Sequence, residues 1–161
     1  MRTKKLSHSG FTLIEAFFTM FIITLFTSLA AGYVQRVRQE ARDVKRLADL
    51  RQVSAALTLF EHQRGNYPLG THVLLGAPEA SALDHRGWVS APEDPAYLTR
   101  LEPDPLAAAT LPCVKNVPQP CAYNYSSADG GDYSIRFYLE HGVPPLAAPG
   151  TYQLTSQGYR P

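Results

Sequence analysis

The sequence predicts an α+β fold in which a long N-terminal spine helix packs on a small antiparallel β-sheet. Three observations predict it. Residues 16–34 form an uncharged apolar run, residues 47–60 carry apolar side chains at helical spacing, and residues 133–140 alternate as a β-strand does. The spine helix would therefore have a membrane half and an amphipathic half.

The apolar run is long enough to cross a membrane. The 19 residues from Ala16 to Val34 carry no charge. As a helix they would span roughly 28 Å at about 1.5 Å per residue, close to the hydrocarbon thickness of a bilayer. A core helix of a soluble protein normally shows a polar face. The polar side chains here make no charged stripe, and they are Thr19, Thr24, Thr27, Ser28 and Tyr33. We therefore predict a transmembrane helix over residues 11–34.

A secretory signal peptide is the competing interpretation of this N-terminus. The basic start fits it, with Arg2, Lys4 and Lys5. However, the apolar region exceeds the usual length of about 7–15 residues, and the small residue Gly10 precedes it instead of following it. Cleavage at Gly10 would remove a basic leader, residues 1–10, and leave the helix on the mature protein. Basic residues favour the cytoplasm, so the C-terminal region would be exported across the inner (cytoplasmic) membrane.

This arrangement resembles the class III signal of type IV prepilins and of type II secretion pseudopilins. The resemblance rests on the sequence GFTLIE at residues 10–15, with Lys4 and Lys5 before it and the apolar run after it. It implies that a prepilin peptidase cuts between Gly10 and Phe11 and N-methylates Phe11. It also implies a pilin-like fold. The family often carries a proline late in the span, whereas this chain has Gly32 near that place.

Glu15 would be the assembly glutamate of this family. An ionised carboxylate in hydrocarbon is costly and usually has a partner. One interpretation places Glu15 at the interface, where it reaches headgroup water. The other pairs it with an amine. Cleavage would create an amine at Phe11, and in a filament the amine of one subunit could meet the carboxylate of its neighbour.

A basic neck follows the span and opens an amphipathic helix predicted over residues 35–63. Its charges are interpreted as a solvated helix face, with side chains such as Arg42, Asp43 and Arg46 in water and with added contact to membrane lipid headgroups. No aromatic platform is interleaved, so direct specific binding of nucleic acid is not expected. The opposite, apolar row consists of Leu47, Leu50, Val53, Leu57 and Phe60, which predicts packing on the exported domain.

Gly65 and Pro68 predict the end of this helix, and the RGNYP turn at residues 64–68 again resembles major pseudopilins. Eight prolines between residues 69 and 120 predict an irregular segment, because proline lacks a donor and fixes φ. By resemblance, residues 64–121 form the αβ loop that joins the spine to the sheet. Trp88 and Tyr97 are expected to anchor this loop to the domain.

The strand signals lie in residues 122–161, which we assign to an antiparallel sheet region. Residues 122–126 are rich in β-formers, and residues 133–140 place Ile135, Phe137 and Leu139 on one face. A glycine turn at residues 128–132 would join these two strands. Residues 150–156 are expected to form a third strand, with Tyr152 and Leu154 facing the core.

Two pairs of residues are candidate sites in the exported domain. Cys113 and Cys121 favour a disulfide in an oxidising compartment, and two free thiols are the alternative. Asp129 and Asp132 flank two glycines, which an ordinary turn explains. Major pseudopilins that this chain resembles bind calcium in a loop of this region, so a calcium site is the alternative there, although this loop offers few of the six to eight oxygens that calcium takes.

Composition and motifs give no support to an enzyme. The chain has 161 residues and a formal net charge of +1, and its five histidines are scattered without HExxH or GxSxG motifs. The resemblance implies a structural subunit of a type IV pilus or a type II secretion pseudopilus. Its expected partners are a prepilin peptidase, like subunits and the inner-membrane assembly machinery. The alternative is a single-pass membrane protein with an exported ligand- or calcium-binding domain, which would need neither Gly10 nor Glu15.

Overall fold

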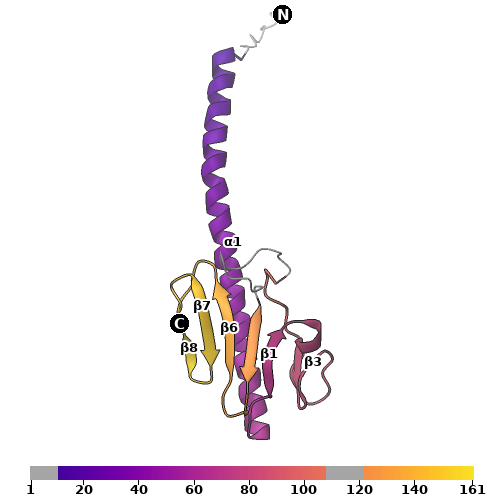
Figure 1. The fold of residues 1–161 in the computed structure, drawn as a ribbon. Helices are drawn as coiled ribbons and strands as arrows, with labels where there is room; N and C mark the ends of the chain where they lie inside the picture. Colours follow the sequence, from indigo (N-terminus) through magenta and orange to yellow (C-terminus); the bar gives the residue numbers. More distant parts are fainter. Residues whose placement is uncertain (1–10, 108–121) are drawn as a thin grey trace, which may run out of the picture. The chain divides into compact units, whose positions relative to one another are not determined.

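A computed structural model describes residues 11–107 and 122–161 (Figure 1). The chain divides into two compact units, Met1–Arg38 and Gln39–Pro161. One helix, α1 (Leu13–Arg64), has residues in both. The described part of the chain otherwise contains short strands and a single turn of 3₁₀ helix. The predicted α+β fold class is confirmed.

The end of α1 follows the predicted stop signal. The Gly65 backbone has φ of 77°, and its N–H donates to the carbonyl of Glu61 at 2.7 Å. Glycine adopts this left-handed conformation without the steric cost that a Cβ brings, which is why it commonly ends helices. The chain then turns toward the sheet, and the Tyr67 N–H donates to the carbonyl of Gly130 at 2.8 Å.

The main sheet has five antiparallel strands in the order β1-β5-β6-β7-β8. Three of them lie where the sequence predicts strands: β5 (Tyr123–Ser127), β6 (Ser134–Leu139) and β7 (Gly150–Thr155). Tyr125 pairs with Ile135, and Ile135 pairs with Leu154. Ile135, Phe137 and Leu139 are buried and alternate with less buried residues, so the alternation predicted for residues 133–140 is confirmed. The short strand β8 (Gly158–Arg160) was not predicted.

The prediction of an irregular segment from residue 69 onward is wrong for much of residues 70–98. Strand β1 (Gly70–Leu75) pairs with β5 at one edge of the main sheet. The 3₁₀ turn η1 (Pro78–Ala80) follows, and then a second sheet in the order β3-β2-β4. Its strands are β2 (Ala82–Asp84), β3 (Gly87–Val89) and β4 (Ala96–Leu98). The prolines of residues 70–98 lie outside these four strands, so they do not prevent strand formation there.

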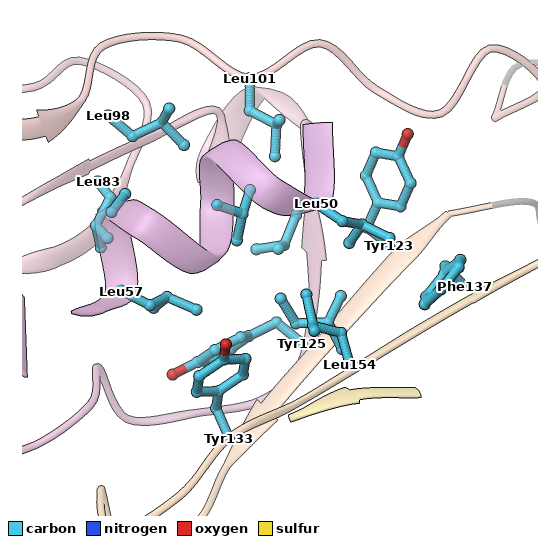
Figure 2. Packing of buried hydrophobic residues seen from close by; sticks show 14 of the residues in the cluster. Leu50, Leu57, Leu83, Leu98, Leu101, Tyr123, Tyr125, Tyr133, Phe137 and Leu154 are labelled. Carbon is cyan, nitrogen blue, oxygen red and sulfur yellow. The ribbon is translucent and has the colours of Figure 1, made fainter. Parts of the chain in front are cut away.

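The core of unit Gln39–Pro161 lies between α1 and the strands (Figure 2). The predicted apolar row of the helix is buried in full. It meets side chains from β5, β6 and β7, including Tyr125, Phe137 and Leu154. Both aromatic anchors of the segment after the helix are also confirmed. The ring of Trp88 lies 5.4 Å from that of Tyr125, and the ring of Tyr97 lies 5.6 Å from that of Phe60.

Candidate functional site

Helix α1 begins directly after the predicted processing junction. Gly10 lies outside the described residues, and Phe11 is exposed. Thr12 caps the helix, because its Oγ1 accepts from the Glu15 N–H at 3.3 Å and its carbonyl accepts from the Ala16 N–H at 3.1 Å. The Thr-x-x-Glu spacing is that of a capping box. The bond to Thr12 uses the backbone N–H of Glu15, so it engages no atom of the carboxylate.

The position of Glu15 also matters electrostatically. It lies in the first turn of α1, where the helix dipole stabilises a negative charge by about 0.3–1 kcal/mol. Its side chain is exposed among large apolar side chains, with Leu13 88% and Ile14 67% exposed. Glu15 is the only Asp or Glu in residues 11–39.

Every residue from Phe11 to Arg38 is exposed in this structure. Most of these side chains are apolar, and Phe17 and Phe26 are each more than 60% exposed. By length and composition, α1 is the one helix among residues 11–107 and 122–161 that could cross a membrane. A single-pass anchor is therefore consistent with the fold. So large an apolar surface is unfavourable in water, at roughly 25 cal/mol per Å², and needs lipid or protein around it.

The hydroxyl groups within the apolar run bond to the helix itself. Thr19 donates to the carbonyl of Ala16 at 2.9 Å, and Thr27 donates to that of Ile23 at 2.7 Å. Thr24 and Ser28 make equivalent bonds one turn back. A polar group with an internal partner costs little in hydrocarbon. These four side chains are therefore compatible with a lipid environment.

A cluster of charged side chains is buried beside α1 in unit Gln39–Pro161. Arg46 is fully buried and donates to both carboxylate oxygens of Asp104, at 2.7 and 3.0 Å. Its Nη1 donates to Asp43 at 2.7 Å and to Glu140 at 2.9 Å. The half-buried Arg42 donates to both oxygens of Glu140 as well. Burial alone would lower the pKa of Arg46, but the bonds to Asp104, Glu140 and Asp43 raise it above its ordinary value.

Asp43 holds the loop that follows β6. Its carboxylate accepts the backbone N–H groups of Glu140, His141 and Gly142 at 3.0, 2.8 and 3.0 Å. Burial would raise the pKa of Asp43, but these three donors, together with Arg46, bring it below its ordinary value. The carboxylate is therefore ionised at neutral pH, and it fixes three consecutive residues of the loop on one turn of the helix.

The interpretation of the neck as a solvated face is wrong for Asp43 and Arg46, which are fully buried, and for the half-buried Arg42. The physical reason is that Asp43 and Arg46 lie on the same side of the helix as the buried row. Their partners lie far along the chain, 58 residues away for Asp104 and 94 for Glu140. Helical spacing alone does not reveal such partners. The prediction holds for other basic residues of the neck, which are exposed: Arg36, Arg38, Lys45 and Arg51.

In the glycine turn at residues 128–132, both carboxylates accept hydrogen bonds from backbone N–H groups. Asp129 accepts the Gly131 N–H at 2.9 Å, and Asp132 accepts the Tyr133 N–H at 2.7 Å. Gly130 has φ of 78°, and a Cβ there would lie 3.0 Å from the Cβ of Asn66. Among the described residues no group of three or more His, Cys, Asp or Glu could hold a metal ion. The calcium site at Asp129 and Asp132 stays a prediction.

An open groove of about 590 Å³ lies in the segment that follows the helix. Its lining comes from η1, from the turn between β2 and β3, from the end of β3 and from the residues after β3: Pro78, Glu79, Arg86, Val89, Ser90, Ala91 and Glu93. Arg86 donates to the buried Asp84 and to Glu93, each at 2.7 Å. The bonds from Arg86 to Asp84 hold the pKa of that carboxyl well below its usual range. No signal in the sequence predicted this groove.

The remaining predicted residues lie outside the described part of the chain, and these are Gly10 and the pair Cys113 and Cys121. The disulfide therefore stays a prediction. No protein-family model, curated protein or solved structure matches the chain.

Proposed function

We propose that this chain is a structural subunit of a helical filament, either a type IV pilus or a type II secretion pseudopilus. A prepilin peptidase would process it, and its N-terminal helix would assemble with those of like subunits. The observation that carries the proposal is the order of features at the N-terminus. A basic leader and the Gly10-Phe11 junction precede a helix in which every residue from 11 to 38 is exposed.

The exposed apolar helix accounts for two states of the protein. Before assembly, lipid would surround residues 11–34, which are long enough to span a bilayer. After assembly, the helices of neighbouring subunits would cover the same side chains. The internally bonded hydroxyl groups of this segment suit both environments. The inner-membrane assembly machinery would move the subunit from one environment to the other.

Glu15 would control the register between subunits. The cleaved chain would begin with the amine of Phe11, and the carboxylate of Glu15 lies in the first turn of the helix. An amine and a carboxylate from two subunits attract strongly where water is excluded. Such a pair would form at one axial stagger only. A membrane protein that merely anchors an exported domain has no need of this carboxylate.

The test is the intact mass of the protein isolated from its native cell. We expect a chain that begins at Phe11 and carries one added methyl group on its amine. Gly10→Ala should be processed better than Gly10→Leu, because a peptidase pocket shaped for a residue without a side chain excludes volume. A mature protein that keeps its leader, or that has lost the apolar helix, would contradict the proposal and leave a plain anchor or a secreted domain.

A further inference from the structure

The outward side of α1 in unit Gln39–Pro161 carries apolar side chains with cations beside them. Val44 and Leu59 are 57% and 53% exposed. The spacing between these positions places them on one side of the helix, and Leu50 and Leu57 are buried on the other. Lys45 and Arg51 are exposed along its two margins. We name this set the cationic stripe, and it consists of Val44, Lys45, Ala48, Arg51, Ala55 and Leu59.

The open groove lined by η1 and β3 is complementary to the cationic stripe, because it combines apolar side chains with carboxylates. Its apolar lining comes from Pro78, Val89 and Ala91, and its exposed carboxylates come from Glu79 and Glu93. Arg86 adds little net charge, because it pairs with Asp84 as well as with Glu93. We name the set of Pro78, Glu79, Val89, Ala91 and Glu93 the acidic groove.

The charges of the surrounding segments have opposite signs in the same way. Among the exposed side chains, residues 35–63 carry four Lys and Arg and no Asp or Glu. The exposed side chains of residues 64–107 carry three Arg against four Asp and Glu. Opposite potentials of this kind steer two surfaces together and set their register.

We propose that the cationic stripe of one copy of this chain docks in the acidic groove of a second copy. The inference rests on the proposed function, and it names the surfaces through which the exported domains would meet. The stripe and the groove are different patches of one molecule, so the contact is heterologous. Such a contact leaves a free stripe and a free groove at the two ends of every pair. It therefore repeats along a filament instead of closing a dimer.

Cross-linking of the full chain in its native cell tests the contact directly. The variant Lys45→Cys with Glu79→Cys should give a ladder of dimers and higher oligomers with a short bismaleimide linker. Either single variant, and the wild type with its native cysteines, should give no ladder. A control pair, Lys45→Cys with Arg136→Cys, uses an exposed position on β6 and should give none. Absence of the ladder from the first variant would overturn the proposal, as would its cross-linking to a different protein instead of a second copy.

Charge exchange tests the same contact without cysteines. Lys45→Glu with Arg51→Glu should lower the yield of sheared filaments by about fivefold or more, as loss of surface ion pairs at each contact predicts. Glu79→Lys with Glu93→Lys should do the same, and Arg86 would keep its bonds to Asp84. A chain with all four changes should recover filaments. Arg136→Glu should leave the yield unchanged. Because Lys45 lies near Asp49, the neutral variant Lys45→Gln with Arg51→Gln is included, and it should show a smaller loss.

The outcomes separate this inference from the proposed function. If the wild type forms no filaments but the cross-linked ladder appears in membranes, the function fails and the contact stands. If filaments form normally and neither the ladder nor the rescue by four changes is seen, the contact is overturned and the function stands.

Discussion

Arg46 is the residue on which the packing of several segments depends. Its guanidinium joins α1 to Asp104 and to Glu140, two positions in separate loops. The carboxylate of Asp43, on the same turn, accepts hydrogen bonds from three backbone N–H groups of the second loop. Each of these charges is compensated only while the others are in place, because a buried charge without a partner is costly.

Arg46→Met should therefore destabilise unit Gln39–Pro161 by about 3–5 kcal/mol, the usual cost of breaking a buried ion pair. The matched control is Arg42→Met, because Arg42 is partly exposed and its guanidinium donates to Glu140. It should cost about 1 kcal/mol or less. Urea unfolding of the full chain in detergent, followed by the fluorescence of the single Trp88, measures both. Equal effects of the two substitutions would show that Arg46 acts as packing volume and not as a buried charge.

Helix α1 is the element that serves two purposes along its length. In residues 11–38 it is exposed on all sides, and from Asp43 onward one side is buried in the core while the other is exposed. The apolar row that the sequence predicted is the buried side. The opposite side carries Val44 and Leu59 without a covering element in the described part of the chain. In this half of the helix, apolar side chains therefore occur both on the buried side and on the exposed side.

Leu57 on the buried side and Leu59 on the exposed side are a matched pair that tests this difference in burial. Leu57→Ala should destabilise the domain by about 2–5 kcal/mol, because it opens a cavity in the core. Leu59→Ala removes an exposed side chain and should change stability by less than about 0.5 kcal/mol. The same urea measurement applies. If the two substitutions cost the same, the helix would be packed on both sides in the isolated subunit.

The segment after the helix shows where element prediction failed. Residues 70–75 contain no proline and are followed by Gly76, so the local pattern allowed a strand. What makes it one is pairing with β5, in which Leu75 lies opposite Tyr123. Gly76 then adopts φ of 81°, and a Cβ there would lie 2.6 Å from the Cα of Pro103. Neither contact is local in sequence.

At the scale of the whole molecule, the proposed role of Glu15 separates insertion from assembly. Glu15→Gln keeps the shape and removes the charge, and Glu15→Val also makes residence in lipid more favourable. Both variants should be processed and stay in the membrane fraction, yet fail to enter filaments. The measurement is the yield of sheared filaments beside the amount of membrane-bound protein.

A third variant separates pairing from capping. Thr12→Ala removes the side chain that accepts from the Glu15 N–H but keeps the carboxylate, so it should assemble nearly as the wild type does. Normal filaments from Glu15→Val would show that apolar packing alone sets the register between subunits, and the charge-pair mechanism would be abandoned.

By itself, the sequence determined the elements whose signals are local. The apolar run, the buried row of the helix, the Gly65 stop and the alternation of β6 each depend on periodicity or on single-residue conformational preference, which act within a few residues. The resemblance that GFTLIE carries is local in the same sense, and the function proposed from it awaits the tests above.

Only the tertiary structure decided which charged side chains of the helix are buried and which part of the following segment forms strands. Asp43 and Arg46 look like surface residues of a basic helix. Arg46 can be buried because Asp104 and Glu140 compensate it from distant loops, and Asp43 can be buried because Arg46 and three backbone N–H groups of the second loop compensate it. Strand β1 joins the sheet because β5 offers an edge. The physical reason is the same in each case. The stabilising partner lies tens of residues away, so no window of the sequence contains both members of the interaction.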